Sequence, residues 1–345
     1  MYKHYKYNTY ILYIMAPKIV FIVPYRSRQH HKFFFCNYMK FILENKDETE
    51  YEVYFSHQCD KRSFNRGAMK NIGFLAIKQK YPEDYKNISF VFNDVDTIPF
   101  NKIFDYETVP GVVKHFYGFK FALGGIVVMN GGDFERINGF PCYWGWGMED
   151  NILQRRCLRG NIKVDRSVFY TIGSPEILQL FDGVERIVSK NDPRQMDERN
   201  NFNGLTTMKQ IYYEFSDKSP DVNDNVFVVP DFKMTYINTS HFQTYIPYNE
   251  NSFHKHDLRG RSTKSLKLNP TTKDVIEAPH KWQNLPPPPP NRKIKNDEER
   301  VIDNVNKNDI IQSHNNNQNR TTIANPNLVM NRFSNRRRGH LRYLK

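Results

Sequence analysis

The chain has 345 residues, of which 39% are hydrophobic and 25% are charged, and its formal net charge is +13. The hydrophobic content excludes a chain that is disordered throughout, and the length suits one or two domains. The basic excess is uneven, because residues 281–345 hold 13 Lys and Arg against 5 Asp and Glu. The remainder is only mildly basic, and nothing in it has the form of a nucleic-acid-binding module.

Residues 1–17 are predicted to form an extension ahead of the folded domain. Their apolar stretch, Tyr10 to Met15, is far shorter than the ~20 residues of a membrane-spanning helix, and it lacks the cleavage site of a secretory signal. We therefore expect no transmembrane segment and a soluble, cytoplasmic protein, with Met15 as an alternative start. The Asn, Lys, Ile and Tyr content is typical of AT-rich genomes; a viral origin would place the protein in the host cytoplasm or the virion.

The first predicted strand covers residues 18–24 and stops at Pro24. Arg26 and Arg28 follow it at the carboxyl end, where open α/β sheets bind their ligands. Guanidinium groups offer paired donors that suit a diphosphate, and the alternative is a solvated turn. A helix over residues 31–44 and a second strand over 51–55 are expected next.

A second helix is predicted to begin after Asn65, a favourable N-cap, and to run to about Lys80. The β-branched and aromatic run that follows, residues 88–92, predicts a buried strand that ends in Asp94 and Asp96. Two carboxylates this close repel each other unless a cation offsets them, and their oxygens suit Mn²⁺ or Mg²⁺. The alternative is an ordinary surface turn.

A strand pair over residues 112–121 is expected to lead to a double glycine, Gly124 and Gly125. The glycines precede a β-branched strand, residues 126–129. A backbone without side chains can approach a ligand closely, so this pair is a candidate ligand contact.

The stretch from Gly139 to Asn151 interleaves Trp144 and Trp146 with glycines and ends in an acidic pair. This pattern predicts a mobile loop that brings flat apolar rings to a ligand such as a sugar. The acidic pair suits the N-terminus of the helix expected after it. The alternative is a turn followed by a charged helix start.

The folded domain is expected over residues 18–250, with strands near 226–230 and 233–238, and a disordered tail over 251–345. The tail holds a proline run at 286–290, an asparagine-rich stretch and a basic end at 336–338. It would bind polyanions or a proline-binding domain, or serve only as a solvating tail. The four cysteines have no metal-type spacing, and we expect free thiols.

Four ordered motifs carry a resemblance: residues 22–28 (IVPYRSR), 64–67 with 71–74, 90–96 (FVFNDVD) and 144–150 (WGWGMED). Together they resemble the β-1,4-galactosyltransferase family, inverting sugar-nucleotide transferases of the GT-A fold. The resemblance covers residues 18–160 well and 161–245 loosely. It implies one Rossmann-like α/β domain with a mixed central sheet. It also implies metal-dependent transfer of a hexose, galactose or N-acetylgalactosamine, from a UDP-sugar to a glycan or glycoprotein hydroxyl.

The resemblance also implies roles for individual residues. Asp150 is the expected general base, and Glu149 would position the loop or the acceptor. The expected donor and nucleotide contacts are Pro24, Arg26, Arg28, Phe64, Arg66, Asp94, Val95, Gly124, Gly125 and Trp146. The expected acceptor contacts are Trp146, Glu149, Asp150 and Asn151. Phe64 would stack on the uracil, although a hydrophobic residue before a helix also serves as a staple.

Three positions depart from the family pattern. Ala122 replaces an aromatic residue that excludes larger donors, so an N-acetyl donor would fit. Asn151 replaces a third acidic residue. Asp96 is the expected ligand of Mn²⁺ or Mg²⁺, but the family's downstream His ligand has no counterpart in residues 176–183. Asp182 and His241 are the candidates to complete the metal site.

Three functions from different classes follow. The first is an active metal-dependent glycosyltransferase. The second, prompted by the missing histidine, is a catalytically inactive protein that binds a sugar nucleotide or a glycan. The third is a nucleic-acid-binding protein, prompted by the basic tail, whose affinity should fall steeply with salt.

Overall fold

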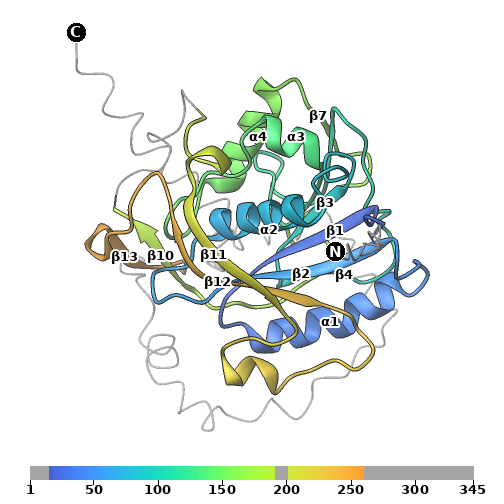
Figure 1. The fold of residues 1–345 in the computed structure, drawn as a ribbon, viewed down its shortest axis with the longest axis horizontal. Helices are drawn as coiled ribbons and strands as arrows, with labels where there is room; N and C mark the ends of the chain where they lie inside the picture. Colours follow the sequence, from blue (N-terminus) through green and yellow to red (C-terminus); the bar gives the residue numbers. More distant parts are fainter. Residues whose placement is uncertain (1–14, 191–200, 260–345) are drawn as a thin grey trace, which may run out of the picture. The chain divides into compact units, whose positions relative to one another are not determined.

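The computed structural model of the protein describes residues 15–190 and 201–259 (Figure 1). The chain divides into two units after Lys255, and the site described below belongs to the first. The predicted tail beyond residue 259 and the apolar stretch from Tyr10 to Ile14 lie outside the described residues. Within the described ranges, no helix combines the length and the apolarity needed to cross a bilayer.

The architecture is a mixed sheet with helices, as predicted. The sheet has nine strands in the order β11-β12-β2-β1-β3-β6-β5-β7, with β8 beside β5. Its strands are β1 (Ile19–Tyr25), β2 (Tyr51–Gln58), β3 (Ser89–Asn93), β5 (Val112–Gly118), β6 (Ile126–Asn130), β7 (Lys163–Asp165), β8 (Tyr170–Thr171), β11 (Lys209–Ser216) and β12 (Thr235–Gln243). Two small sheets pair β4 (Thr97–Pro99) with β9 (Ile177–Gln179), and β10 (Glu185–Ser189) with β13 (Phe253–Asp257). The helices are α1 (Gln29–Leu43), α2 (Arg66–Lys80), α3 (Gly131–Arg136) and α4 (Glu149–Arg159).

Strand β1 lies inside the sheet and decides how the helices pack. It pairs in parallel with both β2 and β3, so the carboxyl ends of these three strands lie at one edge. Its side chains alternate between two cores: Val20 and Ile22 join residues of α2, whereas Phe21 and Val23 join residues of α1. The two helices therefore cover opposite faces of the sheet (Figure 1).

Several predicted boundaries need correction. Strand β1 continues past Pro24 to Tyr25 instead of stopping there, because the pairing with β3 ends at Ile22 and leaves Pro24 beside β2 alone. Residues 112–121 hold one strand, β5, instead of a pair. Residues 226–230 form no strand; Phe227 packs against α1 and its valine neighbours are exposed. All four cysteines lie within the described residues and none of them is in a disulfide, as expected.

Candidate active site

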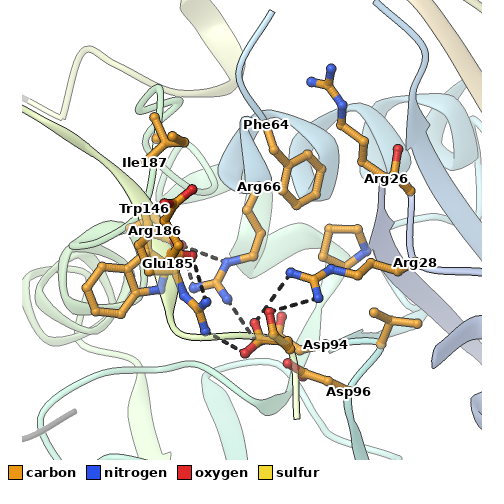
Figure 2. Close-up of a pocket in the computed structure, with 16 residues that line it drawn as sticks. Arg26, Arg28, Phe64, Arg66, Asp94, Asp96, Trp146, Glu185, Arg186 and Ile187 are labelled. Atoms are coloured by element: carbon orange, nitrogen blue, oxygen red, sulfur yellow. Dashed lines mark hydrogen bonds and ion pairs between the residues drawn. The ribbon is translucent and has the colours of Figure 1, made fainter. Parts of the chain in front are cut away.

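A cavity of about 440 Å³ opens at the carboxyl ends of β1 and β3, beside the start of α2 (Figure 2). This edge is where α/β folds bind ligands, and the volume is within the range of small-molecule sites. The lining brings together many of the predicted residues: Pro24, Arg26, Arg28, Phe64, Arg66, Asp94, Val95, Asp96, Trp146, Glu149 and Asp182. Ser27, Gly145, Glu185, Arg186 and Ile187 also line it.

The two arginines that follow β1 have different partners. Arg26 donates to the backbone carbonyl of Arg62, and Figure 2 shows its guanidinium turned away from the acidic end of the pocket. Arg28 donates to the backbone carbonyl of Asp182 at 3.0 Å, and its Nη2 lies 3.7 Å from the carboxylate of that residue. Arg186 binds the other oxygen of Asp182 at 2.5 Å. Asp182 is therefore held between two guanidinium groups.

A tight turn after β3 places Asp94 and Asp96 at the pocket. The Asn93 side chain donates to two carbonyl groups of this turn, both at 2.8 Å, and the Asp94 N–H donates to the carbonyl of Gly125 at 3.0 Å. Burial, with the charges of Asp94 and Asp182, raises the pKa of Asp96 to about 6. The carboxylates at this end of the pocket therefore repel one another.

Arg66 connects the acidic residues of three chain segments. It lies in the first turn of α2. Asn65 caps this turn as predicted, since its side chain accepts a hydrogen bond from the backbone N–H of Ala68. Its guanidinium lies 3.2 Å from Asp94 Oδ2 and 3.0 Å from Asp150 Oδ2, and its Nε donates to Glu149 Oε1 at 2.7 Å. The group expected to bind the nucleotide is thus engaged by three carboxylates.

Asp150 lies in the first turn of α4, next to Gly124. Burial raises the pKa of its carboxyl to about 6, while Lys70 and Arg66 act in the opposite direction. A Cβ on Gly124 would lie 2.4 Å from Asp150 Oδ2, so the close approach requires glycine there. Asp150 does not line the cavity itself; it contacts Arg66, which does.

The two tryptophans of the glycine-rich loop have different roles, and the prediction that the loop presents both rings is wrong for Trp144. That ring is 5% exposed and stacks on Phe242, and its Nε1 donates to Thr244 Oγ1 at 3.0 Å. Trp146 lines the cavity, and its backbone N–H donates to the backbone carbonyl of Ile187 at 2.7 Å. One tryptophan therefore belongs to the core and the other to the site.

The structure does not bring every candidate to the cavity. Gly124, Gly125 and Asn151 are outside its lining, and the Asn151 side chain donates to the carbonyl of Phe121 at 3.2 Å. His241 lies on β12, where its ring packs against Tyr212. It is not among the lining residues.

The acidic residues of the pocket can be tested for a metal ion. Among residues 15–190 and 201–259, no three His, Cys, Asp or Glu side chains are arranged to hold one. Mg²⁺ and Mn²⁺, however, also bind through one or two carboxylates, with substrate phosphates in the remaining positions. Burial, and after it the negative charges of Asp94 and Asp182, raises the pKa of Asp96, and a bound cation would offset both effects. The residues therefore fit a hard cation that is bound together with a phosphate ligand.

Three charged residues of the site escaped the sequence analysis: Lys70, Glu185 and Arg186. Lys70 is buried and pairs with Asp94 and Asp150, and the other two line the cavity. Only Lys70 left a signal in its spacing, since it is four residues after Arg66, whereas Arg186 lies on the strand β10. Side chains four residues apart share one face of a helix, which applies to α2.

Comparisons with known proteins agree with this geometry. Residues 14–108 match the N-terminal region of glycosyl transferase group 7, and residues 112–177 match the N-terminal domain of galactosyltransferase. Human β-1,4-galactosyltransferase 1 is 34% identical over 154 residues, which cover 41% of this chain and 37% of the human protein. The bovine protein of the same name is 33% identical over 163 residues, or 44% and 39% of the two chains. The chain thus spans less than half of the length of these relatives.

Solved structures resemble the fold. A mutant of Drosophila β-1,4-galactosyltransferase 7, in complex with manganese, UDP-Gal and xylobiose, superposes with a TM-score of 0.53 at 20% identity, covering 65% of this chain and 94% of that one. The catalytic domain of the Drosophila protein with xylobiose gives 0.51 at 21% identity. The fold is the GT-A fold of sugar-nucleotide-dependent glycosyltransferases. The two matching sequence regions, within residues 14–177, are similar to the β-1,4-galactosyltransferases.

Proposed function

We propose that the protein is an inverting glycosyltransferase that moves a hexose, galactose or N-acetylgalactosamine, from a UDP-sugar to a hydroxyl of a glycan or glycoprotein. The observation that carries the proposal is the cavity itself. It combines arginines suited to a diphosphate with buried acids at the carboxyl edge of the sheet, beside the candidate base Asp150. The similarity of residues 14–177 to the β-1,4-galactosyltransferases supports the same reaction.

The donor would lie along the cavity from Phe64 to Asp94. Phe64 would stack on the uracil, while Arg26, Arg28 and Arg186 would bind the diphosphate, since guanidinium and phosphate pair through two hydrogen bonds. Asp94 would accept hydroxyl protons of the ribose or the donor sugar. Pro24 and Val95 would form the apolar walls.

Asp96 is the proposed holder of a divalent cation, with Asp182 as the candidate second carboxylate. A bound Mn²⁺ or Mg²⁺ would supply positive charge to the diphosphate leaving group. Arg28 and Arg186 would add charge from the protein, because they already lie within reach of Asp182. His241 has no part in this proposal, given its place beside Tyr212.

Asp150 would act as the general base. It takes the proton of the acceptor hydroxyl as that oxygen attacks the anomeric carbon, and the bond from this carbon to the diphosphate breaks on the opposite side. A pKa of about 6 leaves the carboxylate mostly ionised at neutral pH. Glu149 and Asn151 would orient the acceptor, and Trp146, between two glycines, would close over the donor and exclude water.

A second function is favoured by one observation. Asp150 is paired with Arg66 and Lys70 and lies outside the cavity lining, an arrangement that also suits a protein that binds a sugar nucleotide without turning it over. The third function, nucleic-acid binding, depends on the tail outside the described residues.

The deciding experiment measures hydrolysis and transfer from a panel of UDP-sugars with Mn²⁺, Mg²⁺ or a chelator. The wild type is compared with Asp96→Ala and Asp150→Asn. We expect turnover that needs the metal and is lost in both variants. UDP binding without turnover of any donor would favour the binding protein instead.

A further inference from the structure

Lys70 is a buried cation that lies beside two carboxylates and an aromatic ring. It lies on α2, one turn after Arg66, and its side chain is 1% exposed. Its Nζ lies 3.4 Å from Asp94 Oδ1 and 3.3 Å from Asp150 Oδ1, and 4.6 Å from the centre of the Phe140 ring. Lysine is almost never buried without such pairing, because its ammonium group loses the hydration of water.

Lys70 and Arg66 divide the oxygens of the same two carboxylates between them. Arg66 binds Oδ2 of Asp94 at 3.2 Å and Oδ2 of Asp150 at 3.0 Å, whereas Lys70 faces Oδ1 of each. Each carboxylate is therefore held at both oxygens by cations of one helix. Such a carboxylate cannot rotate about its terminal bond without breaking an ion pair.

We propose that Lys70 is a positioning residue of the transfer reaction, which fixes the orientation of Asp150 and keeps it in its basic, ionised form. This inference rests on the proposed function. Lys70 need not touch the substrate, since it is outside the cavity lining. It acts through Asp150.

The charges around Asp150 show why Lys70 has this effect. The carboxyl group faces Arg66 and Lys70 from α2, Glu149 from α4 and Asp94 from the turn after β3. Burial and the two acidic neighbours favour the protonated form, and Lys70 and Arg66 oppose them. Without Lys70, the protonated and inactive form of the base would extend to higher pH.

The test compares Lys70→Gln with the wild type. Glutamine keeps a hydrogen-bond donor beside the carboxylates and removes the charge. Lys32→Gln is the matched control, because Lys32 is also a buried lysine, 5% exposed, but it donates to Tyr236 Oη outside the cavity. Lys70→Arg, which retains the charge, is the second variant should Lys70→Gln fail to fold. The assays are UDP-galactose hydrolysis across pH, UDP binding by calorimetry, and a carboxyl ¹³C NMR titration of Asp150, assigned with Asp150→Asn.

In Lys70→Gln we expect kcat to fall at least about tenfold and the acidic midpoint of the kcat/KM profile to rise by about one pH unit. UDP affinity should change less than about threefold, and Lys32→Gln should keep the wild-type profile. Lys70→Arg should retain the wild-type midpoint. The proposal would be overturned by an unchanged midpoint in Lys70→Gln or by an equal loss of kcat in Lys32→Gln. If only Lys70→Arg folds, a raised midpoint in that variant would overturn it.

The NMR titration separates this inference from the proposed function. If the wild type turns over no UDP-sugar, the proposed function fails, but the Asp150 pKa is still measurable. A pKa that rises in Lys70→Gln and not in Lys32→Gln then supports the ion-pair role. A pKa that is the same in both overturns it.

Discussion

The contact between Gly124 and Asp150 is a sensitive point of the site, and Gly124→Ala tests it. The added Cβ would lie 2.4 Å from Asp150 Oδ2 and 2.7 Å from its Cγ. Ordinary contacts between heavy atoms begin at about 3.5 Å, so the carboxylate must move by about 1 Å. The backbones cannot easily separate, because the Leu123 N–H donates to the Asp150 carbonyl at 2.9 Å. We therefore expect the side chain to move, which disturbs its pairing with Arg66.

The magnitudes follow from this geometry. Overpacking of this kind costs about 1–3 kcal/mol of unfolding free energy, and a 1 Å displacement of a reacting group costs about 100-fold in rate. Urea denaturation would measure the first effect, and UDP-sugar turnover would measure the second. Asp150→Ala removes the two closest atoms and leaves only the Cβ at 3.2 Å, so most of the stability cost of Gly124→Ala should disappear in that background.

A double-mutant cycle of Gly124→Ala and Asp150→Ala tests whether the contact with the Asp150 carboxylate causes the loss of stability. If Gly124→Ala destabilises the Asp150→Ala protein as much as it destabilises the wild type, the cost does not come from the carboxylate. The close approach would then have no part in placing the base, and the argument from Gly124 would be refuted.

Three further predictions concern the same pocket. Asp150, the proposed base, can take a proton only when it is ionised, and burial raises its pKa to about 6. We therefore expect kcat/KM to rise with pH through about 6 and to level off above it. A profile that is flat from pH 5 to 8 would exclude Asp150 as the base. Arg186→Ala should weaken UDP binding, measured by calorimetry, about tenfold or more, because it removes the proposed charge-assisted contact to the diphosphate. An unchanged affinity would place the diphosphate elsewhere. Trp144→Ala should lower the unfolding free energy by about 3–5 kcal/mol, measured in urea, whereas Trp146→Ala should lower turnover with little loss of stability; the reverse result would contradict the assignment of core and site.

Much of the site could be predicted because its residues directly follow strands or begin helices. Asp94 and Asp96 follow a strand that is buried throughout, and the carboxyl ends of β1 and β3 meet at one edge because the strands are parallel. Asn65 was recognisable as an N-cap from its side chain and its position before a helix. These predictions depend on local chemistry and on the direction of neighbouring strands, both of which the order of residues specifies.

Tertiary structure alone decided which side chains face the ligand and which face the core. Trp144 and Trp146 are two residues apart and share Gly145 as a neighbour, yet only Trp144 stacks on Phe242, nearly a hundred residues away. In the sequence, Lys70 looks like an ordinary surface lysine, but in the structure it is buried and paired with Asp150. Asp182 likewise looks like an unpaired acid, but in the structure it lies between Arg28 and Arg186. Burial and ion pairing depend on contacts between distant segments, and no local pattern in the sequence records them.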